Sequence, residues 1–178
     1  MLADETYAFP ASFAQQRLWI VDQLARHSGA YNMPFAYRLR GPLSLAALRA
    51  ALQALVDRHE ALRTTFVAEG GSLKQVVHGE HVVDLEGGAV DEPGAAVAGG
   101  QLAQILEAEA HYPFDLAAGP LFRARLIRLG AAEHILILNM HHIVSDGWSH
   151  DVLERDLAEL YDSAAKHRPA HLPELPIQ

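Results

Sequence analysis

The chain has 178 residues, a formal net charge of −8 at pH 7 and no cysteine. The acidic balance gives no basic surface for nucleic acid or an anionic membrane. The lack of cysteine excludes a disulfide framework, a thiolate nucleophile and an acylated cysteine intermediate. The first residues, MLADETYAFP, have neither the charged nor the apolar region of a secretory signal, and no apolar run is long enough to span a bilayer. We therefore expect one soluble, cytoplasmic domain with an ordinary core.

The N-terminal part of the sequence predicts two capped helices with a strand between them. Ser12 can cap a helix that runs to about residue 25, and Pro34–Leu39 has the pattern of a strand that ends at Gly41-Pro42. Ser44 can cap the next helix. The apolar residues of that helix recur at helical spacing and predict one core-facing stripe: Leu45, Leu48, Leu52, Leu55 and Val56.

The middle of the chain alternates apolar and polar residues between glycine breaks. This pattern predicts an antiparallel meander with its first turn at Gly70-Gly71. The expected strands are Leu62–Ala68, Leu73–His78 and His81–Leu85. Gly87–Gly100 is rich in glycine and alanine, so we expect a surface loop or the lead-in to a helix there and assign it no chemistry. A helix is predicted over Leu102–Ala110.

The most informative stretch follows, where a buried strand runs into two histidines. Leu121–Leu129 and the apolar run His134–Met140 are predicted to pair antiparallel across the turn Gly130-Ala131-Ala132. His141 and His142 then end the second strand. Because side chains alternate across a strand, one histidine must face the packed interior and the other a cleft.

A tight turn and a helix complete the pattern. Asp146-Gly147 turns the chain, and Ser149 can cap the helix that follows. The apolar positions of that helix are Val152, Leu153, Leu157, Leu160 and Tyr161. This order of elements predicts an α/β fold of the α+β sandwich type, with a mixed, largely antiparallel sheet flanked by helices. Prolines at 169, 173 and 176 favour an extended connector at the end.

Several interpretations of the histidine pair compete. A lone histidine on an apolar strand is most often a hydrogen-bonded core residue. We do not expect a metal site, because His141 and His142 point to opposite faces and no cysteine ligand is available. Ser145 and Ser149 lack the Gly-x-Ser-x-Gly context of a serine hydrolase. A core histidine and a histidine suited to acid–base chemistry beside a rigid turn both stay open.

Three motifs give the sequence a resemblance to a known family. His141–Gly147, HHIVSDG, resembles the HHxxxDG signature of chloramphenicol acetyltransferase-like acyltransferases. Ser12–Trp19, SFAQQRLW, is similar to the first core motif of nonribosomal peptide synthetase condensation domains, and Arg58–Phe66, RHEALRTTF, is similar to their second. The motifs occur in the family's order, and the resemblance extends from Pro10 to the tail LPELPIQ.

The resemblance implies a chloramphenicol acetyltransferase-like lobe. Similar condensation domains are longer and have two lobes, and we do not find the later motifs of the second lobe in this sequence. We therefore expect residues 1–170 to form the N-terminal lobe, residues 171–178 to begin the inter-lobe linker, and the C-terminal lobe to be absent. A naturally short protein is the alternative.

The implied activity is amide bond formation between two carrier-bound thioesters. The α-amine of an acceptor aminoacyl thioester would attack a donor acyl or peptidyl thioester. The implied partners are an upstream donor and a downstream acceptor peptidyl carrier protein, together with the missing lobe. The phosphopantetheine arms belong to these carriers, so no cofactor of the chain itself is expected. The isolated lobe is expected to be inactive, because a tunnel between lobes needs two walls.

The resemblance also implies roles for the motif residues. His142 would be catalytic, as a general base, a positioner of the amine or a stabiliser of the charged intermediate, and His141 would be structural. Asp146 would brace the loop, and Gly147 would let the backbone approach the substrates. A buried carboxylate needs a cation, and Arg63 is our candidate partner for Asp146, with an arginine of the absent lobe as its competitor.

The remaining motif residues are expected to be structural. We expect Arg17 to donate hydrogen bonds within the lobe, Trp19 to join the core, and Arg58 and Ser149 to stabilise their own segments. The charged residues of RHEALR could equally form a solvated helix end.

Two other functions stay open. A lone lobe could dock carrier proteins without catalysing a reaction, or the chain could be a small free-standing CoA- or carrier-dependent acyltransferase. The latter would keep HHxxxDG but is not expected to show the first two motifs. Within the condensation family, RHEALRTTF is similar to domains that accept an L-configured donor. Cyclising relatives replace the histidines with aspartate, and Trp148-Ser149 departs from the Val-Ser of epimerisation domains.

Overall fold

The computed structural model describes residues 6–25, 28–79, 81–88 and 99–175. In chain order its elements are β1 (Tyr7–Pro10), α1 (Phe13–Leu24), β2 (Asn32–Arg40), α2 (Leu45–Arg58), the 3-10 helix η1 (Glu60–Arg63), β3 (Thr64–Glu69), β4 (Ser72–Val77), β5 (Leu85–Gly88), α3 (Gly99–Ala110), β6 (Phe122–Gly130), β7 (Glu133–His141) and α4 (Gly147–Ala165). The predicted α/β class is confirmed. None of the described helices is long and apolar enough to cross a membrane.

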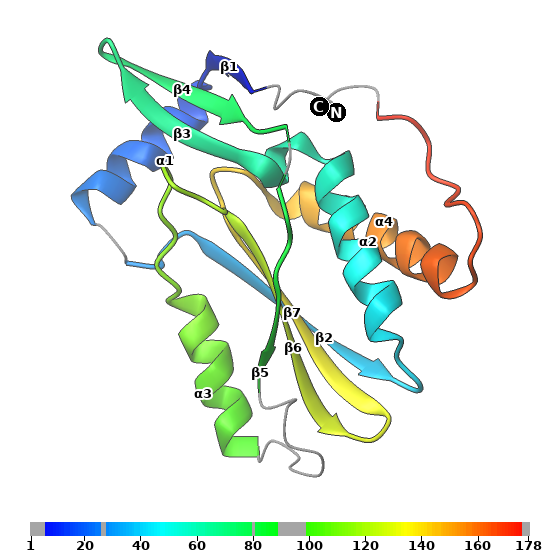
Figure 1. The fold of residues 1–178 in the computed structure, drawn as a ribbon. Helices are drawn as coiled ribbons and strands as arrows, with labels where there is room; N and C mark the ends of the chain where they lie inside the picture. The colour runs from blue at the N-terminus through cyan, green and yellow to red at the C-terminus, as the bar shows by residue number, and fades with distance from the viewer. Residues whose placement is uncertain (1–5, 26–27, 80, 89–98, 176–178) are drawn as a thin grey trace.

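The strands form two sheets (Figure 1). The larger has the order β2-β7-β6-β5 and the smaller has the order β1-β4-β3. β6 and β7 pair antiparallel, as the sequence predicts. β2 pairs antiparallel with the other side of β7, with Asn32 opposite His141, so the start of β2 lies beside the histidines.

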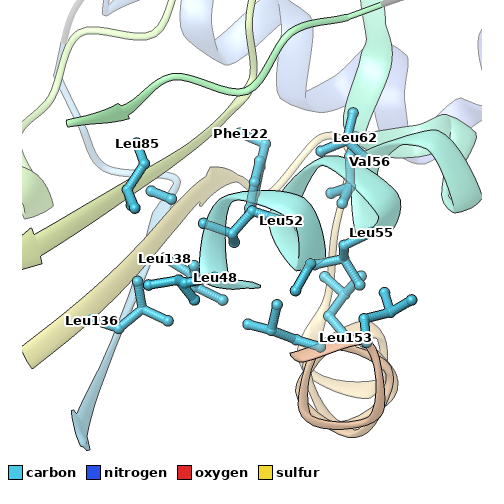
Figure 2. Packing of buried hydrophobic residues seen from close by; sticks show 14 of the residues in the cluster. Leu48, Leu52, Leu55, Val56, Leu62, Leu85, Phe122, Leu136, Leu138 and Leu153 are labelled. Carbon is cyan, nitrogen blue, oxygen red and sulfur yellow. The ribbon is translucent and has the colours of Figure 1, made fainter. Parts of the chain in front are cut away.

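The main core lies between the larger sheet and the helix pair α2 and α4 (Figure 2). Four residues of the predicted α2 stripe are at most 2% exposed: Leu48, Leu52, Leu55 and Val56. Leu45, in the first turn, is 43% exposed and falls outside this core. On β7, Leu136 and Leu138 face α2 and α4, whereas Ile135 and Ile137 face α3 on the other side of the sheet. This alternation is the one that a strand covered on both faces requires.

The first two helices begin where their caps predict. The Ser12 side chain accepts a hydrogen bond from the backbone of Gln15, and the Gln15 side chain accepts one from the Ser12 backbone at 2.8 Å. This reciprocal pair is a capping box. Ser44 Oγ accepts from Ala47 N at 3.2 Å. Local side-chain chemistry therefore sets both helix starts.

The predicted meander is wrong in its third strand. β3 and β4 form the expected hairpin around Gly70-Gly71. Residues 81–84 form no strand, because the Gln53 side chain of α2 donates to His81 O and accepts from Val83 N. β5 then pairs parallel with β6 in the larger sheet. The second neighbour of β4 is β1, a strand that the sequence pattern does not predict.

Two predicted segments lie partly outside the described residues. Residues 89–98 of the expected loop Gly87–Gly100 and residues 176–178 of the expected connector belong to this part of the chain. α3 begins at Gly99, three residues before the predicted start. The described tail, residues 166–175, continues without helix or strand. Leu172 packs against the main core, and Pro173 O accepts a hydrogen bond from Arg58 Nη2, so the tail runs back along α2.

Candidate active site

The two histidines at the end of β7 point to opposite sides. His141, the last residue of β7, is 4% exposed, and its ring lies against Tyr31 and Phe114 at centroid distances of 6.3 and 6.4 Å. His142 is exposed and lines an open pocket. This is the opposed placement that strand alternation predicts.

His141 is a neutral structural residue. Its Nδ1 accepts a hydrogen bond from Ile143 N at 3.1 Å, so the neutral ring carries its proton on Nε2. Burial lowers the pKa of His141 to about 4, and the adjacent His142 acts in the same direction. The buried ring therefore fixes the start of the loop without carrying a charge at pH 7.

We expect His141 to make the fold sensitive to acid. The folded pKa is about 4 and the ordinary value is 6.5, so the unfolded state binds more protons between these pH values. The stability is fully present above pH 6.5 and is lost as the pH falls toward 4. Between pH 7 and pH 5 this residue should cost about 2 kcal/mol of unfolding free energy. Chemical denaturation at the two pH values measures the loss.

The matched variant is His141→Asn, which keeps an acceptor for Ile143 N and cannot titrate. Its unfolding free energy should depend less on pH than that of the wild type. Other buried histidines contribute equally to both proteins and cancel in the comparison. Identical pH dependence of the two proteins would show that His141 is not buried in its neutral form.

His142 is held by its own loop. Its backbone N–H donates to Tyr31 O at 2.8 Å, and its Nδ1 lies 2.6 Å from Ser145 O. Because a carbonyl only accepts, Nδ1 must carry a proton, and Nε2 of the neutral ring is an acceptor. The two adjacent histidines thus have opposite tautomers. A fixed ring that presents an acceptor nitrogen is suited to receive a proton from a substrate.

The pocket of His142 has a volume of about 390 Å³ and lies between α1, η1 and the loop of residues 142–146, which we call the histidine loop. We call this pocket the histidine pocket. The first motif contributes four lining residues: Ser12, Ala14, Gln15 and Leu18. The second motif contributes Ala61 and Thr64, and the third contributes His142 and Asp146 among others. Three motifs that are far apart in the sequence therefore meet around one exposed imidazole.

Asp146 differs from its predicted environment, because it is exposed and caps α4. Its Oδ1 accepts hydrogen bonds from Ser149 N at 2.8 Å and from Ser149 Oγ at 2.7 Å. These two bonds hold the pKa of Asp146 below its ordinary value, and the bond from the Ser149 backbone N–H has the larger effect. The prediction that Ser149 is the cap is wrong, since Ser149 lies three residues inside and acts as donor. Asp146 braces the turn as a helix cap.

The predicted pair of Arg63 with Asp146 is also wrong. Arg63 Nη1 donates to His78 O, and Nη2 lies 3.4 Å from Glu60 Oε1. Arg63 therefore connects η1 with the end of β4 instead of reaching the histidine loop. Its role is to hold the segment that contributes Ala61 and Thr64 to the histidine pocket.

The carboxylate that binds the second motif is Asp156 in the middle of α4. Asp156 is 0% exposed, lies 2.9 Å from Arg58 Nε and 3.0 Å from His59 Nε2, and also accepts from the adjacent Arg155. Burial raises the pKa of Asp156, but the hydrogen bonds from these three side chains outweigh burial and hold it below the ordinary value. RHEALR is thus no solvated helix end: its first two residues tie α2 to α4.

We expect Asp156→Ala to destabilise the fold by about 3–5 kcal/mol, because it leaves Arg58 without its buried counter-charge and His59 without its hydrogen-bond partner. Urea unfolding of the wild type and the variant measures the difference. Asp151→Ala is the matched control, since Asp151 is exposed on the same helix and should change stability by less than about 0.5 kcal/mol. Equal, small losses in both variants would contradict a structural role for Asp156.

Three further motif residues are placed as follows. Trp19 is partly buried and packs against a cluster around Phe66 and Phe114, as expected. Arg17 is exposed on α1, and no hydrogen bond from it to the described residues is seen, so its role as a donor within the lobe stays a prediction. Gly147 begins α4, and a Cβ there would meet no described atom within 4 Å.

In the part of the chain that the structure describes, no group of His, Asp and Glu could hold a metal ion.

The two sheets, with the histidines at the end of β7, have the chloramphenicol acetyltransferase-like fold. A variant of the starter condensation domain of rhizomide synthetase has this fold, with a TM-score of 0.84 at 23% identity over 94% of this chain and 40% of that chain. The X-domain in complex with OxyB from teicoplanin biosynthesis has it too, with a TM-score of 0.83 at 31% identity over 95% of this chain and 35% of that chain.

Sequence comparison is more specific. A linear gramicidin synthase of Brevibacillus parabrevis is 46% identical over 178 residues, which cover 99% of this chain and 3% of the synthase polypeptide. Residues 5–177 match the model of the condensation domain. The chain therefore belongs to the condensation domain family of nonribosomal peptide synthetases. It spans only a small part of the length of the synthase that it matches.

Proposed function

We propose that the chain is the histidine-bearing N-terminal lobe of a condensation domain that forms an amide between two carrier-bound thioesters. Residues 1–170 would form the lobe, and the inter-lobe linker would begin at residue 171. The observation that carries the proposal is the meeting of three motifs around His142 in one open pocket. Membership of the condensation domain family supports the reaction class.

The pocket suggests how its residues would act. The amine of the acceptor attacks the thioester carbonyl of the donor, a C–N bond forms, and the C–S bond then breaks to release the donor thiol. His142 Nε2 accepts a hydrogen bond from the attacking amine and takes up the proton that the nitrogen loses. That proton then passes to the sulfur that leaves. The Nδ1–H bond to Ser145 O keeps the ring in the required tautomer throughout.

The proposed partners are two peptidyl carrier proteins, an upstream donor and a downstream acceptor, and the second lobe of the domain. Their phosphopantetheine arms would bring both thioesters to the histidine pocket, so the chain would use no cofactor of its own. We also propose that the reaction takes place in the cytoplasm.

A second candidate function is docking without catalysis. The observation that favours it is the solved complex of the X-domain with OxyB, because that domain shares the fold of this chain and binds another protein. On this alternative His142 would be an exposed residue without a role in chemistry.

One assay separates the two functions. A complete condensation domain that contains this chain is given a donor carrier loaded with an acyl thioester and an acceptor carrier loaded with an aminoacyl thioester. Mass spectrometry of the acceptor arm should show the donor acyl group in amide linkage, and the product should require both loaded carriers. Binding of both carriers without any product would favour docking and overturn the catalytic proposal.

A further inference from the structure

A second pocket, with a volume of about 260 Å³, adjoins the histidine pocket. Ala61, Val144 and Ser149 line both pockets, so the two pockets are direct neighbours. The second pocket lies between η1 and the first two turns of α4, and Leu175 of the tail borders it. The reaction proposed above makes no use of this space.

The lining of the second pocket is largely apolar. Val152 and Trp148 of α4 form one side, and the buried side chains of Leu62 and Leu153 lie at its base. Trp148 is 81% exposed, so a large apolar ring stands uncovered at the rim. Exposed apolar surface that borders a pocket indicates a binding site.

The titratable residues of the second pocket, His59 and Glu60, already have partners within the chain. His59 Nε2 lies 3.0 Å from Asp156, and the Glu60 carboxylate lies 3.4 Å from Arg63 Nη2. Burial lowers the pKa of His59, so its ring is neutral at pH 7, and Glu60 has its counter-charge in Arg63. Neither residue therefore requires an ionic ligand. A charged group placed between Ala61 and Trp148 would lose hydration without gaining a partner. The pocket therefore favours an apolar occupant.

We propose that the second pocket binds the apolar side chain of a carrier-bound aminoacyl or peptidyl substrate. We call it the side-chain pocket. This inference rests on the proposed function, which places a thioester beside His142, so that the substituent on the neighbouring carbon reaches Ala61 and Val144. The side-chain pocket accepts an aliphatic group of the size of the leucine side chain and selects against charged side chains.

The test measures binding to the chain itself through Trp148. In a Trp19→Phe background Trp148 is the only tryptophan, because the chain has two. Three non-hydrolysable probes are titrated: glycyl-pantetheine amide, leucyl-pantetheine amide and N-acetyl-leucyl-pantetheine amide. The leucyl probes should bind about tenfold more tightly than the glycyl probe and shift the Trp148 emission to shorter wavelength as the ring is covered. N-acetyl-leucyl-pantetheine amide resembles a donor, and leucyl-pantetheine amide, with its free amine, resembles an acceptor. Whichever of these two probes binds more tightly identifies the substrate whose side chain the pocket holds.

Ala61→Phe should fill the side-chain pocket and remove the difference between leucyl and glycyl probes. Ala158→Phe is the matched control: Ala158 is likewise an exposed alanine, but it lines a separate groove beside β2. The control should keep the tenfold difference. Circular dichroism checks that both variants fold, and Ala61→Leu serves as a milder filling variant. Equal binding of glycyl and leucyl probes, no binding of any probe, or equal loss in both phenylalanine variants would overturn the proposal.

Failure of the side-chain pocket and failure of the proposed function are distinguishable. The binding test does not depend on catalysis, so His142→Ala should keep the preference for leucyl probes. If the chain prefers leucyl probes but the complete domain forms no amide, the side-chain pocket is retained and the proposed function is wrong. If the complete domain forms amide but the chain binds all three probes equally, the proposed function is retained and the side-chain pocket is wrong.

Discussion

Replacing His142 with alanine should lower amide formation by the complete domain by about 10²- to 10⁴-fold, the usual contribution of a positioned acid–base residue. The substitution removes the acceptor Nε2 from the histidine pocket while leaving the packing of the loop intact, because His142 is exposed and Ile143 anchors the neighbouring turn at 4% exposure. The rate of transfer from donor to acceptor carrier at saturating concentrations of both measures the loss. The melting temperature should stay within a few degrees of the wild type.

His111→Ala is a matched control for this variant. His111 is also exposed, and its Nδ1 also lies near a backbone carbonyl, that of Glu107 at 2.9 Å, but it does not line the histidine pocket. Its removal should leave the transfer rate unchanged. A His142→Ala variant that transfers at the wild-type rate would remove His142 from the mechanism and leave docking as the better function for this lobe.

Much of the local structure follows from the sequence. Ser12 and Ser44 set the starts of α1 and α2 because the side chain that caps each helix is adjacent in sequence to the groups it satisfies. The placement of His141 and His142 on opposite sides of β7 follows from the two-residue period of a strand. These features depend on neighbours in the chain, which one sequence shows directly.

The cap of α4 is harder to predict, because Asp146 and Ser149 are both good capping residues and lie three positions apart. The pattern alone does not say which of them accepts and which donates. Asp146 is the cap, because its carboxylate accepts hydrogen bonds from both the backbone N–H and the hydroxyl of Ser149. This arrangement satisfies the first turn better than a hydroxyl cap at Ser149 would.

Partners distant in sequence could not be predicted. Arg58 and Asp156 are separated by 98 positions, and no local pattern links them. One signal was present: Asp156 interrupts the buried stripe of α4 between Leu153 and Leu157, and a carboxylate on an apolar face requires a cation from another element. The path of residues 81–88 from the hairpin to the larger sheet also depends on a residue distant in sequence. The Gln53 side chain on α2 makes the hydrogen bonds to His81 and Val83 that a neighbouring strand would otherwise make.

We also expect the open histidine pocket to limit the activity of the chain alone. The described residues place His142 at the surface, and Trp148 is uncovered at the rim of the adjoining pocket. On the proposed function, the chain would supply one side of a site that holds two phosphopantetheine arms together. Holding two reactants in a productive geometry can be worth effective molarities of about 10⁵–10⁸ M. We therefore expect the chain alone to form amide several orders of magnitude more slowly than the complete domain, although it folds with its own core between the larger sheet and α2 and α4.

The measurement is the same carrier-to-carrier transfer assay with three samples: the chain alone, the chain mixed with a separately produced second lobe, and the complete domain. A cooperative thermal transition of the chain alone establishes that it is folded before its activity is compared. The mixture should recover part of the rate, in proportion to the fraction of lobes associated, because the second lobe restores the other wall around His142. Transfer by the chain alone at the rate of the complete domain would contradict the two-wall site and favour a self-sufficient acyltransferase whose pocket is closed by another copy of the chain.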